Sequence, residues 1–245
     1  MRKFGLIGRN ISYSFSQNYF SIKFKDENIL DATYQNFDIQ SINQFKKEIL
    51  ATDHLAGLNV TIPFKEEIIP LLDKVDKKAK KIGAVNTIKI TKKGKTKGYN
   101  TDCYGFKKSL KPLLKKQHKN ALILGTGGAS KAIAYVLKQL NIDYKFVSRT
   151  ASNNADYTYT DLNQELINNH QIIINCTPVG TYPKVDQAPD IPYQFITSNH
   201  ILYDLIYNPS TTLFLQEGKN KGATIINGYD MLVFQAEKAW KIWNK

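Results

Sequence analysis

The most regular pattern of apolar and polar residues lies between residues 120 and 150. A short apolar run, Ala121–Leu124, stops at the glycine-rich stretch Gly125–Gly128. Apolar residues then recur three and four positions apart over residues 129–140, which predicts one face of a helix. A second apolar run occupies residues 144–147. Strand, glycine turn, helix and strand together predict a β-α-β unit of the size found in dinucleotide-binding domains.

Apolar runs and helical spacings alternate on both sides of this unit. Before it, strands are expected at residues 3–8, 32–37 and 57–61, the first two followed by amphipathic helices, and then a helix at 76–82, a hairpin of strands 88–91 and 96–99, and a helix at 103–114. Pro63 favours the start of a further helix after the strand at 57–61, because a proline suits the first position of a helix. After the unit, helices are expected at 161–168, 211–218 and 229–243, and strands at 171–175, 201–205 and 224–226. This alternation is typical of α/β proteins.

The length and composition fit a globular protein with one large or two small domains. The chain has 245 residues, of which 42% are hydrophobic, enough for a sizeable core. Its cysteines, Cys103 and Cys176, are far apart and lack partners at ligand spacing, which argues against disulfides and structural zinc. No run approaches the roughly 18 apolar residues of a membrane span, and the first apolar run is too short for a signal peptide. We therefore expect a cytoplasmic protein.

The net charge of +13 raises the question of a nucleic-acid partner. The lysines gather at residues 74–81, 89–97 and 107–119. These clusters lack interleaved aromatic residues, and no nucleic-acid-binding module is recognisable. We expect solvated surfaces that mildly attract anionic cofactors, and no nucleic-acid partner.

The glycine turn and the end of the following strand carry the cofactor prediction. Such a turn can expose backbone N–H groups to a phosphate, but Ser130 stands at the third glycine position of the G-x-G-x-x-G pattern, so the glycines could serve only packing. The strand after the helix ends at Ser148-Arg149-Thr150, where an NAD site would carry an acidic residue for the ribose 2′-hydroxyl. Because a guanidinium suits a 2′-phosphate, NADP is favoured over NAD; the alternative is a solvated arginine.

Polar residues at the ends of the early strands are candidates for a substrate site. Ser14 and Ser16 stand at a strand-to-helix junction, where they could bind an anion such as a carboxylate, or one of them could cap the helix. Asn59, Thr61 and Lys65 lie at the edge of the sheet where ligands bind in open α/β folds. Lys65 would begin a helix, where the dipole disfavours a cation, so its placement needs a reason beyond that of a surface lysine.

In their order and spacing, these motifs resemble the shikimate dehydrogenase family over nearly the whole chain. The matching segments are the pair Ser14 and Ser16, and residues 59–65 (NVTIPFK), 83–87 (GAVNT), 100–105 (NTDCYG), 125–129 (GTGGA), 148–150 (SRT), 175–180 (NCTPVG), 203–209 (YDLIYNP) and 228–235. Departures from the family's usual pattern occur at Gln17, Phe20, Ser148 and Tyr229-Asp230, and none of them removes a catalytic group.

The resemblance implies a fold and an activity. The expected fold is an open α/β substrate-binding domain over residues 1–101 and 228–245, closed by the C-terminal helix, and a Rossmann-type NADP-binding domain over residues 102–227. The active site is expected in the cleft between them. The implied reaction is the reversible NADPH-dependent reduction of 3-dehydroshikimate to shikimate, on the route to chorismate and the aromatic amino acids.

The resemblance also implies a role for individual residues. Lys65 would donate the proton, and Asp102, which could otherwise be only a helix cap, would orient it, with no metal needed. The substrate would be held by Ser14, Ser16, Asn59, Thr61, Asn86, Tyr207 and Gln235. The cofactor would be bound by Gly125, Gly127, Gly128, Ala129, Ser148, Arg149, Thr150, Thr177, Leu205 and Gly228.

Two other functions remain open for this sequence. One is a quinate or shikimate dehydrogenase that uses NAD, against which Arg149 counts. The other is a non-catalytic shikimate-binding homologue, against which the presence of both Lys65 and Asp102 counts. The expected partners are small molecules, and a monomer and a homodimer are equally compatible with the sequence.

Overall fold

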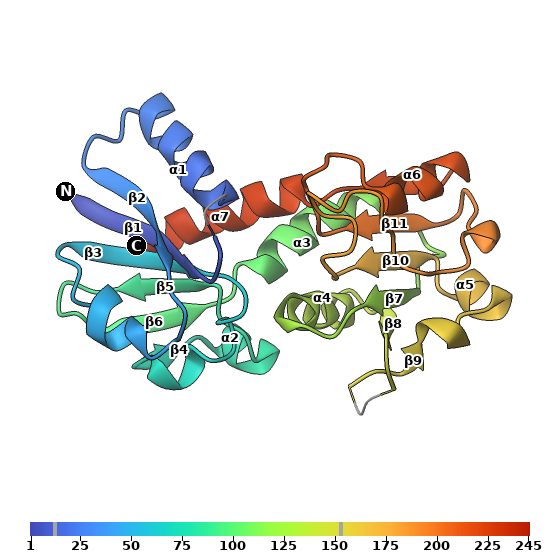
Figure 1. The fold of residues 1–245 in the computed structure, drawn as a ribbon, viewed down its shortest axis with the longest axis horizontal. Helices are drawn as coiled ribbons and strands as arrows, with labels where there is room; N and C mark the ends of the chain where they lie inside the picture. Colours follow the sequence, from blue (N-terminus) through green and yellow to red (C-terminus); the bar gives the residue numbers. More distant parts are fainter. Residues whose placement is uncertain (12–13, 152–153) are drawn as a thin grey trace. The chain divides into compact units, whose positions relative to one another are not determined.

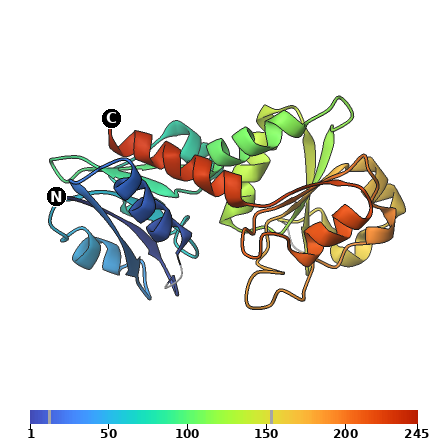
Figure 2. The ribbon, with the colours of Figure 1, turned by 90° about the horizontal axis from the view of Figure 1, so that it is seen from above.

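The computed structural model describes residues 1–11, 14–151 and 154–245. The chain forms two compact units, each an α/β structure, so the predicted fold class is confirmed (Figures 1 and 2). The first unit contains Met1–Tyr104 and Val233–Lys245, and the second contains Gly105–Leu232. The sequence predicts domain changes at 101/102 and 227/228, whereas the units change inside the helices that follow those positions. The assignment of substrate and cofactor to the two domains stays a prediction.

The first unit is built on a mixed sheet with the strand order β2-β1-β3-β5-β6-β4 over the described residues. Its strands are β1 (Arg2–Gly8), β2 (Ala32–Asp38), β3 (Leu55–Val60), β4 (Lys74–Val75), β5 (Thr87–Ile90) and β6 (Thr96–Tyr99). The central strand β1 pairs in parallel with β2 and β3, and β5 and β6 form the predicted antiparallel hairpin. The carboxyl ends of β1, β2 and β3 therefore meet at one edge of the sheet.

Helices cover both faces of this sheet. The helices α1 (Phe15–Asp26) and α7 (Tyr229–Trp243) bury an aromatic cluster that includes Phe4, Phe20 and Trp243. Gly57 is required where α7 meets β3, because a Cβ atom there would lie 2.3 Å from the Trp243 indole. The Trp243 Nε1–H also donates a hydrogen bond of 2.9 Å to the carbonyl of Ile88. The last turn of α7 is thereby fixed to the sheet of the first unit.

The second unit is built on a parallel sheet with the order β12-β11-β10-β7-β8-β9 over the described residues. Its strands are β7 (Asn120–Leu124), β8 (Asp143–Ser148), β9 (Tyr157–Thr158), β10 (Ile172–Asn175), β11 (Ile201–Asp204) and β12 (Thr224–Ile226). This is the Rossmann order, which reverses between β7 and β10. Ligands of such sheets bind beyond the carboxyl ends of the strands at the point of reversal.

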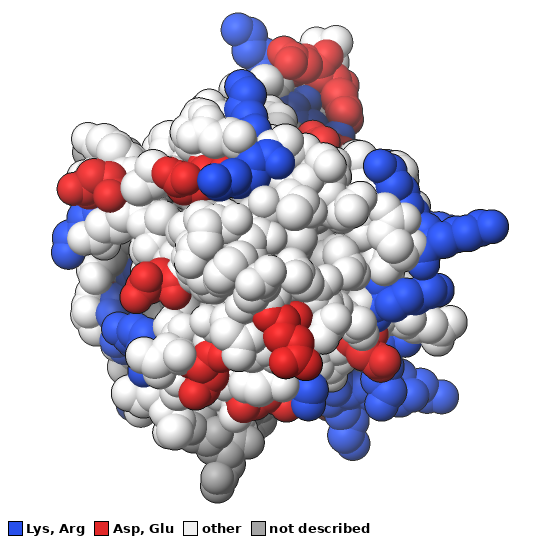
Figure 3. Space-filling view, turned by 90° about the vertical axis from the view of Figure 1, so that its right-hand side faces the viewer, with Lys and Arg blue, Asp and Glu red and all other residues white. Residues whose placement is uncertain are grey.

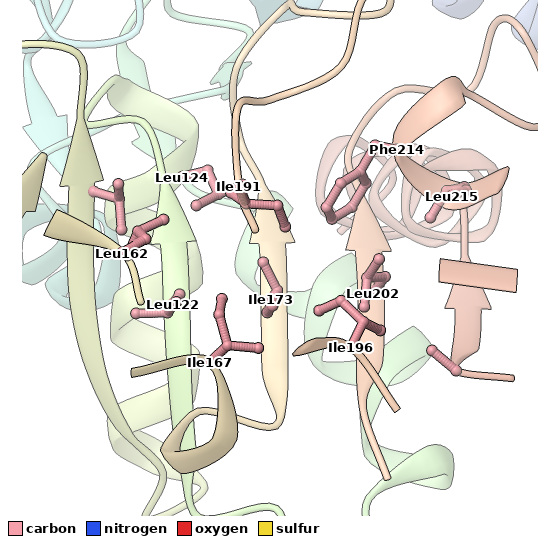
Figure 4. Packing of buried hydrophobic residues seen from close by; sticks show 12 residues of the cluster. Leu122, Leu124, Leu162, Ile167, Ile173, Ile191, Ile196, Leu202, Phe214 and Leu215 are labelled. Carbon is pink, nitrogen blue, oxygen red and sulfur yellow. The ribbon is translucent and has the colours of Figure 1, made fainter. Parts of the chain in front are cut away.

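The remaining helices and the core of the second unit follow the sequence pattern closely. The helices are α2 (Lys77–Ile82), α3 (Asp102–Leu110), α4 (Gly128–Gln139), α5 (Gln164–Asn169) and α6 (Leu213–Asn220), with 3₁₀ turns at Ile69–Leu71, Lys111–Leu113, Tyr159–Asp161 and Tyr193–Phe195. On one face of the sheet, Leu122 of β7 lies near Ile167 of α5, and Leu202 of β11 lies near Phe214 of α6, with Ile173 of β10 between them (Figure 4). Burial on both faces explains why these strands are continuous apolar runs.

Two predicted helices of the first unit take other forms. The run after Pro63 is a series of tight turns, because Phe64 and Ile68 are buried while Pro70 has no N–H to continue a helical ladder. The run after Ser41 is a short π-helical turn, η1 (Phe45–Ile49). The strands β4 and β9 were not predicted, since a two-residue strand carries no readable periodicity.

Lysine and arginine side chains project from the surface. On the face shown in Figure 3 they gather along one margin, while acidic side chains are scattered over the rest. Among the residues that the structure describes, no helix has both the length and the apolar character to cross a membrane.

Candidate functional site

Lys65 and Asp102 form an ion pair in the first unit. The Lys65 Nζ atom lies 2.8 Å from the Asp102 Oδ2 atom, with the two side chains 14% and 8% exposed. Lys65 belongs to the turns after β3, and its carbonyl accepts a hydrogen bond of 2.8 Å from the N–H of Val85. Asp102 is the first residue of α3, where the helix dipole favours a carboxylate. The fold therefore brings together two residues that are far apart in the sequence.

Asn86 holds the other oxygen of the same carboxylate. Its Nδ2 atom donates to Asp102 Oδ1 over 2.7 Å. Its Oδ1 atom accepts a bond of 2.7 Å from the N–H of Thr101. Gln235 of α7 adds its Oε1 atom, 3.4 Å from Asn86 Nδ2 and 3.3 Å from the Thr101 hydroxyl. Both carboxylate oxygens of Asp102 are thus fixed, one by a cation and one by an amide.

Asn59 joins this network from the end of β3. Its Nδ2 atom donates to the carbonyl of Asn86 over 3.2 Å and to the Thr87 hydroxyl over 3.3 Å. Its Oδ1 atom accepts a bond of 2.8 Å from the hydroxyl of Tyr34. Tyr34 is buried, and burial raises the pKa of its hydroxyl, which therefore stays a donor. The orientation of the Asn59 amide is consequently fixed from both sides.

The two serines lie at the start of α1. Ser14 is its N-cap, and its hydroxyl accepts a bond of 3.3 Å from the N–H of Gln17. Ser16 is buried in the first turn. Thr61 directly follows β3, and its N–H donates to the carbonyl of Ile7 over 2.8 Å. Capping by Ser14 leaves the anion-binding prediction open, because a helix N-terminus has several unpaired N–H groups.

The glycine turn of the second unit has the form expected of a phosphate site. Gly125 has φ of +98°, which favours glycine, and Gly127 is the N-cap of α4. Among the described residues no side chain is seen to cap this helix, and a Cβ atom at Gly127 would meet nothing within 4 Å there. Gly128 and Ala129 form the first turn, so their N–H groups belong to the positive end of the helix dipole. An anion would be stabilised at this N-terminus.

The arginine that is predicted to bind the 2′-phosphate lies at the end of the neighbouring strand. Arg149 directly follows β8, is exposed, and has no hydrogen-bond or ion-pair partner among the described residues. Its positive charge counteracts the burial that raises the pKa of Tyr159 to about 12. The Ser148 hydroxyl donates to the carbonyl of Thr150, so this serine shapes the turn that carries the arginine. The guanidinium is thus available to an anionic ligand.

The remaining predicted cofactor residues follow β10, β11 and β12. Thr177 donates from its N–H and its hydroxyl to Asn175 Oδ1, over 3.0 and 2.7 Å. Gly228 donates its N–H to the carbonyl of Ile206 over 2.9 Å, and a Cβ atom there would lie 2.1 Å from the carbonyl oxygen of Leu205. Thr177 and Leu205 are at the carboxyl edge of the parallel sheet. The predicted substrate residue Tyr207 is half-buried in the loop after β11.

Several residues of these networks were missed in the sequence. Tyr34, Thr87 and Thr101 orient the amides of the first unit, and Asn175 and Asp204 orient the loops of the second. Thr87 and Asn59 are register partners across β3 and β5, so a correct strand pairing would have placed them together. Tyr34 could not have been found that way, because it lies on β2, two strands from Asn59.

Two further features of the described residues bear on the search for a site. A surface hollow of about 630 Å³ in the first unit includes Arg2, His54 and Lys92. It lies near the beginnings of β1 and β3, at the opposite edge of the sheet from Asn59, and it is lined by none of the predicted site residues. No three His, Cys, Asp or Glu side chains within the described ranges are grouped as metal ligands.

Comparison with known proteins shows which proteins this chain is similar to. Residues 6–88 match the model of the shikimate dehydrogenase substrate binding domain. A shikimate dehydrogenase (NADP(+)) of Methanosphaera stadtmanae is 40% identical, over 98% of this chain and 90% of that protein. The crystal structure of shikimate dehydrogenase from Aquifex aeolicus has a TM-score of 0.88 and 37% identity, covering 100% of this chain and 92% of that chain. The Thermus thermophilus enzyme, in complex with NADP(H) and shikimate, has a TM-score of 0.87 and 28% identity, covering 99% and 93%.

Proposed function

The chain belongs to the shikimate dehydrogenase family, and we propose that it catalyses the reversible NADPH-dependent reduction of 3-dehydroshikimate to shikimate. The observation that carries the proposal is the buried pair of Lys65 and Asp102, held by Asn86. A structural ion pair of this kind contributes little net stability, because desolvating two charges offsets their attraction. A lysine that a carboxylate holds in one orientation at the edge of a sheet is instead suited to proton transfer. The product would enter the synthesis of chorismate and the aromatic amino acids.

Lys65 would act as the proton donor. NADPH, when bound, supplies the hydride. As the substrate carbonyl is reduced, its oxygen gains negative charge, which the Lys65 ammonium stabilises before it transfers a proton to that oxygen. Asp102 would keep the ammonium oriented through the 2.8 Å contact until the transfer. In the reverse direction, neutral Lys65 would accept the proton of the substrate hydroxyl.

The first unit would hold the substrate with donors and acceptors that are already oriented. Ser14 and Ser16 would bind the carboxylate at the N-terminus of α1, together with Tyr207. Asn59, Thr61, Asn86 and Gln235 would bind the ring hydroxyls. Asn59 and Asn86 are fixed by their neighbours, so little side-chain entropy remains to be lost when the substrate binds.

The second unit carries groups that fit NADP. The N-terminus of α4, where the N-cap residue is a glycine and the described residues leave open space at Gly127, suits the pyrophosphate. Arg149, assisted by Ser148 and Thr150, would hold the 2′-phosphate, which a guanidinium can meet with paired hydrogen bonds. Thr177, Leu205 and Gly228 would line the nicotinamide end. No acidic side chain follows β8 directly, so the ribose of NAD would lack its usual acceptor.

We also propose that the enzyme acts in the cytoplasm, on small molecules and without a nucleic-acid partner, as a monomer or a homodimer. The net charge of +13 comes from lysine clusters that do not belong to any recognisable nucleic-acid-binding module. They would attract the anionic substrate and cofactor instead.

The proposal is tested by following the absorbance of reduced nicotinamide with purified protein. Four reactions, shikimate or quinate with NADP or NAD, separate the proposed activity from its nearest alternatives. We expect turnover to be fastest with shikimate and NADP. Faster turnover with quinate and NAD would instead support the alternative of a quinate or shikimate dehydrogenase that uses NAD. Shikimate binding without turnover in any reaction would indicate a non-catalytic homologue.

A further inference from the structure

Asp204 is a fully buried carboxylate at the end of β11. Among the described residues no basic side chain is paired with it. Its Oδ1 atom accepts bonds of 3.1 Å from Asn175 Nδ2 and 3.0 Å from the N–H of Ile206, and its Oδ2 atom accepts one of 2.6 Å from the Thr212 hydroxyl. Burial raises the pKa of Asp204 to about 6, against the effect of these hydrogen bonds. Such a carboxylate is costly to bury, so the fold must gain something specific from it.

The three donors come from three different connections. Asn175 ends β10, and its Oδ1 atom binds Thr177 twice. Ile206 belongs to the loop after β11. Thr212 is the N-cap of α6, and its hydroxyl accepts from the N–H of Leu215 over 3.4 Å. Asp204 is therefore the common acceptor that joins these connections at the carboxyl edge of the parallel sheet.

The proposed nicotinamide residues are each attached to this network. Thr177 is bound to Asn175, which is bound to Asp204. Leu205 directly follows Asp204, and its N–H donates to the carbonyl of Asn175 over 3.0 Å. Gly228 donates to the carbonyl of Ile206, and its close approach to Leu205 leaves no room for a side chain. Movement of the Asp204 carboxylate would displace all three.

We infer that Asp204 is a positioning residue for the cofactor, whose carboxylate holds the loops after β10 and β11 in the shape needed at the nicotinamide end. The inference rests on the proposed function. It assigns the buried carboxylate to cofactor binding and not to substrate binding, since all its partners lie in the second unit, whereas all the proposed substrate residues except Tyr207 lie in the first. It also explains why an acid can stand near a site for an anionic cofactor, because its charge is met by three donors.

The test is calorimetry with NADP and with shikimate, each alone, on wild type and Asp204→Asn. The amide has only one acceptor oxygen and no charge. Its NH2 group would face either Ile206 N–H and Asn175 Nδ2, which cannot accept, or the Thr212 hydroxyl, which must turn its own proton away. We expect the Kd for NADP to rise at least tenfold and the Kd for shikimate to change less than twofold. Thr212→Val removes one bond to Asp204 and should raise the NADP Kd severalfold, whereas Thr212→Ser keeps the hydroxyl and should restore it.

The outcomes separate the inference from the proposed function. A wild type that binds neither ligand contradicts the proposed function. If the wild type binds both, unchanged NADP affinity in Asp204→Asn overturns the inference alone. Equal weakening of both ligands would show a general structural role and also overturn it. Should Asp204→Asn fail to fold, the Thr212 pair decides, because equal NADP affinity in Thr212→Val and Thr212→Ser contradicts the network.

Discussion

Asn86 donates a hydrogen bond of 2.7 Å to Asp102 Oδ1, while Lys65 occupies Oδ2 of the same carboxylate at 2.8 Å. The amide fixes the plane of the carboxylate, and the carboxylate in turn fixes the lysine. Asn86 is itself fixed by the N–H of Thr101, the residue next to Asp102. The proposed acid is thus oriented by a short closed loop of contacts and not by one flexible ion pair.

Asp102→Asn should lower kcat by about 10²-fold and change its pH profile. The amide keeps the shape of the carboxylate but loses its charge and the ion pair with Lys65. We expect the profile to change because one of the two ionisable groups proposed for the proton transfer is then absent. The measurement is kcat and kcat/KM for shikimate against pH, in wild type and variant. An unaltered profile would remove Asp102 from the acid–base role, even if kcat falls.

Arg149→Ala should raise the KM for NADP at least about tenfold, equivalent to about 1.4 kcal/mol, and change the KM for NAD little. The guanidinium has a partner in the 2′-phosphate, which NAD lacks. Steady-state kinetics with each cofactor measure this difference. An equal rise in the KM for both cofactors would indicate that Arg149 has a structural role. If neither weakens, the 2′-phosphate is held by Ser148, Thr150 or nearby lysines.

Gly127→Ala should weaken NADP binding about tenfold with little loss of stability. Its backbone conformation, φ −76° and ψ 179°, is open to alanine, and the added methyl group would project into open space where we place the pyrophosphate. Gly57→Ala is the matched contrast, because its methyl group would lie 2.3 Å from the Trp243 ring and cost about 1–3 kcal/mol of stability. Chemical denaturation and NADP titration of both variants give the comparison. NADP affinity unchanged in Gly127→Ala would place the pyrophosphate elsewhere.

The contribution of Asp204 to the free energy of unfolding should fall as the pH rises from 4 to 7. Its pKa is raised from 3.8 to about 6 in the folded state, so over this range the folded state binds more protons than the unfolded one. Stability contributed by this group is full at the lower pH and falls by up to about 3 kcal/mol through the folded pKa. The measurement is the free energy of unfolding against pH in wild type and Asp204→Asn. A difference between them that does not change with pH would contradict the raised pKa.

The fold could be predicted where apolar periodicity was strong. The strands β7, β10 and β11 are buried on both faces, and the last helix shows a clear stripe, so its limits Tyr229 and Trp243 were found in the sequence. The turns after Pro63 were predicted as a helix because a proline suits the first position of a helix, but Pro70 has no N–H to continue the helical hydrogen bonds. The two-residue edge strands β4 and β9 are too short to show a periodic pattern in the sequence.

Candidate site residues could be named in the sequence, but their hydrogen-bond and ion-pair partners could not. Lys65 and Asp102 were found through motifs, and their contact depends on the strand order that brings the end of β3 beside the start of α3. Asp204 was within a recognised motif, yet its role depends on Thr212 and Asn175 converging from other connections. Such convergence is a property of topology, which local sequence patterns do not contain.

The central claim is that Lys65 gives the proton, and Lys65→Ala tests it most directly. A proton donor acts mainly in the transition state, so its removal should lower kcat by about 10²–10⁴-fold. The Kd for shikimate, measured by calorimetry, should stay within about threefold of wild type, since ring hydroxyls and carboxylate keep their proposed partners. Loss of turnover with retained binding is the predicted result. Equal losses of affinity and turnover would make Lys65 a substrate-holding group and contradict the account.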